Sequence, residues 1–201
     1  MITAALGAMG IDGFMSAMPV PVDALDDAIA VFRDVIPLGV SVTVPHKEAV
    51  IASCDERSAE VDAIGAANCL EFRDGKVIAH NTDAAGFADS LGFTPHHVVI
   101  LGGGGAARAV AYGLRKAKLH VVARRPASWT ASRGWSELPA LLGDADLLVD
   151  CTSAGLEPRT DDELANSVPL DALPRAATVA TLIYHRRTRL LERAAALGYS
   201  T

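Results

Sequence analysis

The 201-residue sequence has little of several features that mark particular classes of protein. It contains three cysteines, too few and too scattered for a disulfide framework or a Cys-x-x-Cys metal site: Cys54, Cys69 and Cys151. No apolar run reaches the roughly 18 residues that a membrane-spanning helix needs. The opening stretch MITAALGAMG lacks the basic start and long apolar segment of a signal peptide. We therefore expect a cytoplasmic globular protein that holds no metal and does not enter a membrane.

An excess of basic charge is also missing. The chain has 18 lysines and arginines against 24 aspartates and glutamates, which gives a formal net charge of −6. Nucleic-acid-binding domains usually carry a basic face, so we expect no nucleic-acid partner. Half of the residues are hydrophobic and 21% are charged, a balance typical of folded rather than disordered chains.

Apolar runs of four to six residues alternate with segments of helical period along the whole chain, a pattern typical of α/β folds. In the first half this pattern predicts helices over 2–9, 23–35 and 47–54, and strands over 13–20 and 39–44. Asp74-Gly75 separates the strand-like runs 67–72 and 77–81, which predicts a hairpin. The stretch 92–96 is the predicted junction with the second half.

The second half predicts parallel strands over 97–101, 119–123, 147–151 and 178–183. We therefore predict two α/β domains, over 1–92 and 97–183. Residues 184–201 are expected to form a helix that returns toward the first domain.

A glycine-rich turn follows the first strand of the second half. Gly102-x-Gly104-x-x-Ala107 between a strand and a helix is typical of a dinucleotide-binding Rossmann domain. The first glycine allows a tight turn, the second lets a pyrophosphate approach the backbone, and a small third residue allows close packing. Free N–H groups at the helix start favour the phosphates. The alternative is a connecting turn without a ligand.

The residues after the next strand discriminate between NAD and NADP. An NAD site carries an acidic residue about 20 residues after the glycine turn. Here Arg124 and Arg125 occupy that region. Guanidinium groups bind a 2′-phosphate that a carboxylate would repel, so the pattern predicts NADP. The alternative is two surface arginines.

Two segments of the first half carry candidate chemistry. Lys47 lies two residues after Pro45, which ends the predicted strand 39–44. Strand ends in α/β sheets face the ligand crevice, so Lys47 is a candidate general acid or base, although most lysines are surface charges. Asp83 opens a predicted helix, where its simpler role is an N-cap. Asn68 has a similar simpler role as a turn amide.

Together these segments resemble the shikimate dehydrogenase family. The resemblance rests on GVSVTVPHKEAV, DAIGAANCLEF, GKVIAHNTDAAGF, VVILGGGGAARAV and DLLVDCTSAGL, which occur in the family's order. It implies reduction of 3-dehydroshikimate to shikimate with NADPH, a step in chorismate and aromatic amino-acid biosynthesis. The fold implied is a substrate domain over 1–92 and a Rossmann NADP-binding domain over 97–183, with the active site in the cleft between them.

The resemblance also implies roles for individual residues. Lys47 is expected to be the catalytic acid or base and Asp83 its partner. The substrate-binding residues implied are Thr43, Lys47, Asn68, Asp83 and Tyr184. The expected cofactor-binding residues are Gly102, Gly103, Gly104, Gly105, Ala106, Arg124, Arg125 and Leu182.

The family's N-terminal Ser-x-Ser strand and C-terminal glutamine-bearing helix have no counterpart in this sequence. We therefore expect the first domain to be incomplete at its N-terminus. Two alternatives stay open for the function. One is a dehydrogenase for quinate or a related cyclic hydroxy acid, and the other is a non-catalytic NADP-binding protein.

Overall fold

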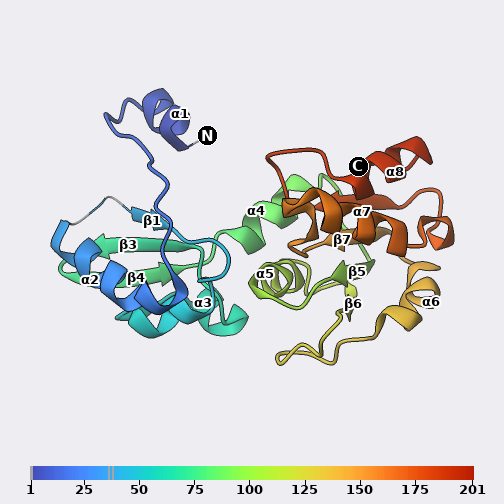
Figure 1. The fold of residues 1–201 in the computed structure, drawn as a ribbon, viewed down its shortest axis with the longest axis horizontal. Helices are drawn as coiled ribbons and strands as arrows, with labels where there is room; N and C mark the ends of the chain where they lie inside the picture. Colours follow the sequence, from blue (N-terminus) through green and yellow to red (C-terminus); the bar gives the residue numbers. More distant parts are fainter. Residues whose placement is uncertain (1, 36, 38) are drawn as a thin grey trace.

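The computed structural model describes residues 2–35, 37 and 39–201, which contain two four-stranded sheets (Figure 1). The first sheet has the order β1-β3-β4-β2 and consists of β1 (Gly39–Ser41), β2 (Glu56–Arg57), β3 (Cys69–Arg73) and β4 (Lys76–His80). The second has the order β6-β5-β7-β8 and consists of β5 (His97–Leu101), β6 (Lys118–Val122), β7 (Leu147–Asp150) and β8 (Thr178–Thr181). The chain is thus an α/β protein with one sheet in each half.

The hairpin at the centre of the first sheet is confirmed. β3 and β4 pair antiparallel, and the two residues between them, Asp74 and Gly75, both have positive φ angles, 53° and 75°. That combination is the type I′ turn whose twist matches the flanking strands. Helix α2 (Leu25–Val35) contributes Ile29 to the core of this half, which includes Leu70 and Val77 of the hairpin.

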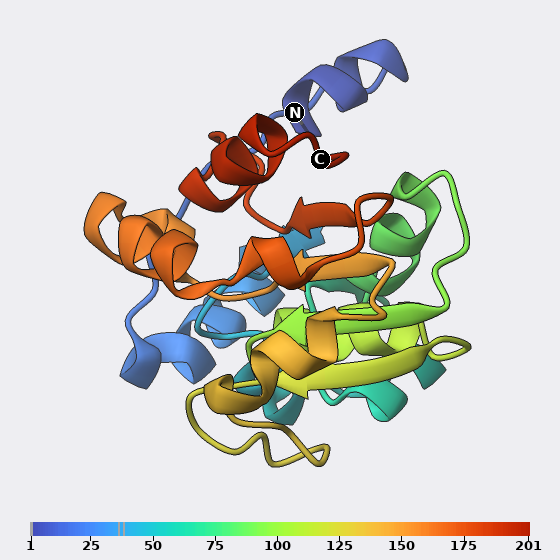
Figure 2. The ribbon, with the colours of Figure 1, turned by 90° about the vertical axis from the view of Figure 1, so that its right-hand side faces the viewer.

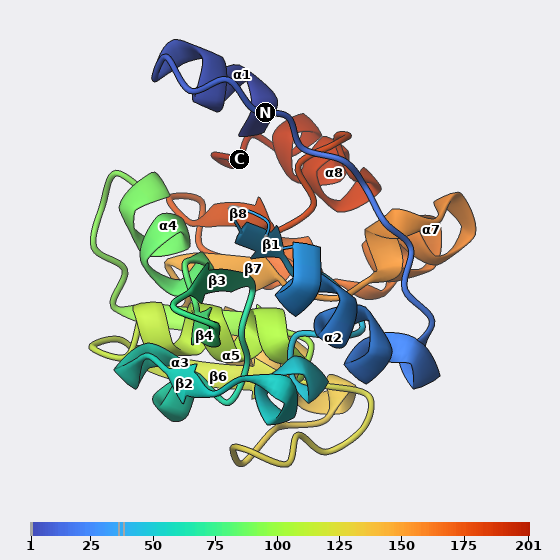
Figure 3. The ribbon, with the colours of Figure 1, turned by 90° about the vertical axis from the view of Figure 1, so that its left-hand side faces the viewer.

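The predicted strand over residues 13–20 is wrong. These residues are extended, but they pair with none of the described strands, and Phe14 is 83% exposed. Alternating apolar side chains do not make a β-strand unless a neighbouring strand forms hydrogen bonds with the backbone N–H and C=O groups. The helix predicted before it is present as α1 (Ile2–Ala8), which lies apart from the first sheet (Figure 3).

Two other first-half elements are shorter than predicted. The strand expected over 39–44 is limited to β1, and the helix expected over 47–54 is the 3-10 helix η2 (Ala49–Ser53). Two short elements that the sequence pattern did not indicate, β2 and α3 (Ala59–Ile64), follow it.

The second sheet is entirely parallel, and its chain starts in the middle at β5 before crossing to either side (Figure 2). Alternate residues of a strand face opposite sides of a sheet. Val98 and Ile100 accordingly pack with α5 (Gly105–Gly113). Val99 and Leu101 face a separate cluster, to which three helices contribute: α6 (Leu138–Leu142), α7 (Pro158–Ser167) and α8 (Arg189–Ala196).

Helix α8 packs on the second sheet, so its packing does not show the expected return toward the first domain. Leu190 and Ala194, one turn apart, are both fully buried in the cluster that also holds Val179 of β8. The Tyr199 hydroxyl shares its one proton between the carbonyl oxygens of Leu170 and Leu173, which lie 2.6 and 3.0 Å from its oxygen. The apolar side of α8 therefore packs against the sheet that contains β8, the strand that precedes the helix in the chain.

The two halves are joined through α5. Its small residues pack against α3 and against α4 (Asp83–Ser90), with Ala109 in one cluster with Ile64, Ala66 and Ala84. At the end of α5, Gly113 lies directly against the backbone of Ala84. Small side chains let these helices approach closely, so the packing of α5 on α3 and α4 sets the position of one half relative to the other. Among the described helices, none has both the length and the hydrophobicity of a membrane-spanning segment.

The close approach at Gly113 generates a stability prediction. A methyl group at this position would collide with the carbonyl oxygen of Ala84, so we expect Gly113→Ala to lower the free energy of unfolding by about 1–3 kcal/mol. Gly86→Ala in α4 is the matched control, because a methyl there meets no atom within 4 Å. We expect that control to raise the free energy of unfolding by about 0.5–1 kcal/mol. Urea denaturation measures both, and equal stability of Gly113→Ala and wild type would contradict the close packing.

Candidate active site

The register of the first sheet brings three predicted site residues to one edge. Ser41 at the end of β1 pairs with Cys69 at the start of β3, and Cys69 pairs with His80 at the end of β4. The segments that continue beyond these three residues therefore leave the sheet at the same edge. They carry Lys47, Asn68 and Asp83.

Lys47 and Asp83 form an ion pair. Lys47 Nζ lies 2.6 Å from Asp83 Oδ2, and the side chains are 15% and 23% exposed. The pair is therefore largely shielded from solvent yet open on one side. An ammonium group held in this way combines a proton donor with a fixed orientation, which general acid catalysis requires.

Asn68 holds the second oxygen of the same carboxylate. Its Nδ2 donates to Asp83 Oδ1 at 2.7 Å, while its Oδ1 accepts from the backbone N–H of Thr82 at 2.8 Å. The amide is thus oriented from both ends, and both oxygens of Asp83 have a partner. The hydrogen bonds of the Asn68 side chain go to Thr82 and Asp83, 14 and 15 residues away, so Asn68 belongs to the network.

The N-cap role considered for Asp83 is not observed, because Thr82 is the N-cap residue of α4 and Asp83 is the first helical residue. The side chain that bonds to the helix start is that of Asn81. Asn81 Oδ1 accepts from the backbone N–H of Ala84 at 3.3 Å, and its Nδ2 donates to the carbonyl oxygen of Ala66 at 2.9 Å. Because this buried side chain serves the helix start, the carboxylate of Asp83 is available to Lys47. The sequence pattern did not indicate a capping role for Asn81, although asparagine is among the residues best suited to bond to a helix start.

Two predicted substrate residues lie outside this network. Thr43 is exposed and lines an apolar groove with Phe14 and Phe32. Tyr184 is 83% exposed, and its ring meets that of His185 edge-on at a centroid distance of 6.5 Å. Their roles in substrate binding stay predictions.

A cavity of about 610 Å³ lies at the carboxyl ends of β5, β6 and β7. All the predicted phosphate-binding residues line it: Gly102, Gly103, Gly104, Gly105, Ala106, Arg124 and Arg125. Val44 and Glu48 line it from the first half. Leu182 is not among its lining residues and packs beside the cluster under α5. The cavity thus lies between the glycine-rich turn and the segment that carries Lys47.

The glycine-rich turn needs glycine at its first position. Gly102 has a φ of +108°, and a Cβ atom there would lie 3.1 Å from the carbonyl oxygen of Cys151. Gly104 is the N-cap residue of α5 and has an extended conformation. The first N–H groups of the helix have no acceptors within the helix itself. Trp129, which the sequence did not indicate, fixes the turn by donating from Nε1 to the carbonyl oxygen of Gly103 at 2.8 Å.

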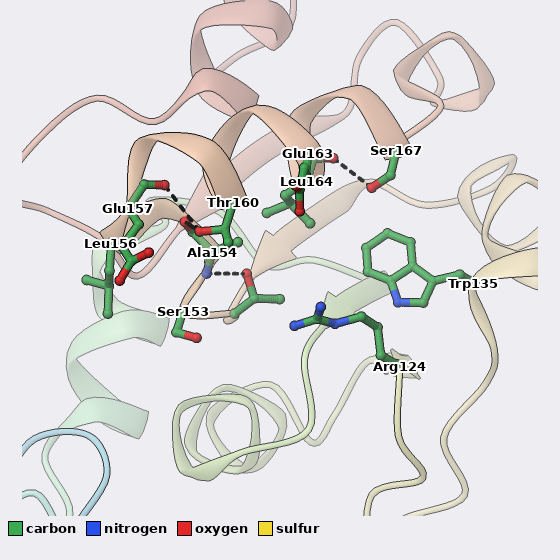
Figure 4. A pocket seen from close by; sticks show the side chains of 11 residues that line it. Arg124, Trp135, Ser153, Ala154, Leu156, Glu157, Thr160, Glu163, Leu164 and Ser167 are labelled. Atoms are coloured by element: carbon green, nitrogen blue, oxygen red, sulfur yellow. Dashed lines mark hydrogen bonds between the residues drawn. The ribbon is translucent and has the colours of Figure 1, made fainter.

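A second cavity of about 610 Å³ adjoins the first between the end of β6 and α7. Figure 4 shows Arg124 and Trp135 on one side of it and side chains of Ser153–Ser167 on the other. Arg124 and Trp135 line both cavities. Arg124 thus places a guanidinium, a group that can bind phosphate with two hydrogen bonds, at the junction of the two cavities.

Comparison with known proteins shows which family this chain is similar to. The model of the shikimate dehydrogenase substrate binding domain matches residues 1–70. A curated relative, the shikimate dehydrogenase (NADP(+)) of Symbiobacterium thermophilum, is 36% identical over 100% of this chain and 76% of its own length.

Solved structures of shikimate dehydrogenases are similar as well. That of Aquifex aeolicus has a TM-score of 0.86 and 28% identity, and the match covers 98% of this chain and 77% of that one. That of Thermus thermophilus, in complex with NADP(H) and shikimate, has a TM-score of 0.83 and 32% identity, with the same coverage.

Cys151 lines the glycine-rich cavity, and its chemistry yields a prediction. Burial raises the pKa of its thiol well above the usual value, and the neighbouring carboxylate of Asp150 raises the pKa further. A raised pKa means that the thiol stays protonated at pH 8, and only the thiolate is nucleophilic. We expect iodoacetamide to label Cys151 at least about tenfold more slowly than free cysteine. Mass spectrometry of the native protein, with urea-unfolded protein as the control, measures this. Labelling at the rate of free cysteine would contradict it.

Proposed function

Because this chain belongs to the shikimate dehydrogenase family, we propose that it catalyses the NADP-dependent, reversible reduction of 3-dehydroshikimate to shikimate. The observation that carries the proposal is the position of the Lys47–Asp83 pair beside the glycine-rich cavity. A Cβ atom on Gly105 would lie only 3.4 Å from Cβ of Lys47. A nicotinamide that leaves the glycine-rich turn toward the first half therefore arrives next to a proton donor.

The chemistry follows from the charges of these groups. NADPH, when bound, supplies a hydride to the carbonyl carbon of the substrate. The electron pair of the carbonyl bond moves to the oxygen, which the Lys47 ammonium stabilises and protonates. Asp83 keeps the ammonium in position and offers its carboxylate to a substrate hydroxyl. The neutral amine of Lys47 regains its proton from water, and the oxidation of shikimate runs through the same steps in reverse.

The residues of the cavity fit the cofactor. The N–H groups of Gly103 to Ala106 would bind the pyrophosphate, because a helix start favours anions. The N–H of Gly102 donates to the carbonyl oxygen of Val122 at 2.9 Å, so Gly102 would contribute its close backbone approach instead. Arg124 and Arg125 would bind the 2′-phosphate, since no carboxylate follows β6. Gly103 keeps the turn narrow, as a Cβ there would meet Cβ of Ala127 at 3.2 Å. Leu182 remains our proposed neighbour of the nicotinamide.

A polyhydroxylated ring requires several donors and acceptors, and we assign them to Thr43, Asn68, Asp83 and Tyr184. A site of this kind rejects analogues that lack a hydroxyl, because its polar groups would stay unpaired.

The absorbance of NADPH, followed with shikimate and NADP⁺, tests the proposed reaction. Faster turnover with quinate would favour the related dehydrogenase, and no turnover with either would favour the non-catalytic alternative. We further propose a cytoplasmic location, which suits the three free thiols.

The first prediction of this proposal concerns Lys47. We expect Lys47→Ala to lower kcat at least about 100-fold, the scale of general acid catalysis, and to leave the Kd of NADPH within about twofold. Lys76→Ala is the matched control, because Lys76 is 56% exposed and pairs with Glu56 on the first sheet. Steady-state kinetics and fluorescence titration give the two values. A loss below tenfold would show that Lys47 is not the proton donor.

The second prediction concerns the choice of cofactor. We expect NADPH to bind at least about tenfold tighter than NADH, equivalent to about 1.4 kcal/mol. The double variant Arg124→Gln/Arg125→Gln should abolish this preference and leave the affinity for NADH unchanged, because only the 2′-phosphate contact is lost. Calorimetry with both cofactors measures it. An unaltered preference in the double variant would refute the role of the arginines.

A further inference from the structure

An ion pair crosses from the cofactor half to the segment of Lys47. Arg108, in the first turns of α5, donates from Nη2 to Oε2 of Glu48 at 2.7 Å. Glu48 is the residue after Lys47, and both members of the pair line the glycine-rich cavity. The pair therefore joins the wall that would hold the dinucleotide to the wall that holds the proton donor.

Arg108 lies in a slot built by both halves. Its side chain is only 16% exposed, and a Cβ atom on Gly65 of the first half would lie 2.8 Å from its Nη1. On the other side, its Nη2 lies 3.5 Å from Oγ of Ser128. Gly65 also has a φ of +69°, a backbone conformation that favours glycine. The slot leaves the guanidinium little freedom to choose another partner.

Glu48 directly follows Lys47 in the chain, and the backbone of Lys47 is itself hydrogen-bonded. The carbonyl oxygen of Lys47 accepts a hydrogen bond from Ala67 N–H at 2.7 Å, next to Asn68 of the carboxylate network. A Cβ atom on Gly105 would meet Cβ of Ala66 at 3.3 Å and Cβ of Lys47 at 3.4 Å. The start of α5 thus packs closely on the Lys47 segment, and the ion pair connects the same two elements.

We propose that Arg108 and Glu48 are positioning residues. Their ion pair across the cavity, here called the tie, sets the position of the Lys47 ammonium relative to the bound cofactor. The proposal rests on the proposed function, since it concerns hydride transfer in this cavity. The Glu48 side chain is 46% exposed, and a pair open to solvent contributes little to stability. Geometry is the more sensitive quantity, because a displacement of about 1 Å can cost about 100-fold in rate.

Single-turnover kinetics tests the tie. Enzyme loaded with NADPH is mixed with excess 3-dehydroshikimate, and the fall in NADPH absorbance gives a rate and an amplitude. The rate reports hydride transfer, and the amplitude reports the fraction of active molecules. We expect Arg108→Gln and Glu48→Gln each to lower the rate at least about tenfold. The amplitude should stay unchanged, and the Kd of NADPH should stay within about twofold.

Two comparisons make the result specific. Arg57→Gln is the control, because Arg57 pairs with Asp62 within the first half, at 3.5 Å, and should leave the rate unaltered. The near-isosteric Glu48→Gln carries the test if Arg108→Gln does not fold. Unaltered rates in both variants would overturn the tie. A weaker Kd with an unaltered rate would also overturn it and would make Arg108 a phosphate contact. A wild type without hydride transfer would overturn the proposed function itself, and the tie with it.

Discussion

The ion pair between Lys47 and Asp83 depends on two segments that are 36 residues apart in the chain. They meet because the register of β1, β3 and β4 places three strand ends at one edge of the first sheet. Asn68 leaves the sheet between them and holds the carboxylate from its other side. A shift of one residue in this register would turn the side chains of a strand to the opposite face. The chemistry of the site therefore depends on the hydrogen-bond ladder of a small sheet.

The second requirement is a short distance between that edge and the glycine-rich turn. Small residues provide it, because Ala66, Ala84 and Ala109 let α5 pack closely on the first half. Gly105 faces Lys47 at the cavity end of the helix, and Gly113 faces Ala84 at the other end. A larger side chain at either end would move the second half away from Lys47, our proposed proton donor. The same packing that joins the two halves thus also shapes the catalytic cavity.

Much of this arrangement could be predicted from local patterns. Lys47, Asn68 and Asp83 follow or precede strand-like runs, and the glycine-rich turn has its strand and helix on either side, so physical rules place them at sheet edges. The strand expected over 13–20 shows the limit of such rules, because pairing depends on a neighbour that side-chain alternation does not reveal. The capping role of Asn81 could not be predicted, because three adjacent polar residues, Asn81, Thr82 and Asp83, are all candidates for capping the same helix. Arg108 and Glu48 are 60 residues apart, and their contact arises only from the packing of α5.

A crystal structure of the chain with NADP⁺ and shikimate bound together would test the central claim most directly. The account predicts that one ring hydroxyl of shikimate lies within hydrogen-bonding distance, about 3 Å, of both Lys47 Nζ and the Asp83 carboxylate. It also predicts that the nicotinamide carbon lies about 3.5 Å from the ring carbon bearing that hydroxyl. The pyrophosphate should rest on the N–H groups of the glycine-rich turn. Shikimate bound away from Lys47, or a dinucleotide outside the cavity of Gly102 to Ala106, would contradict the account.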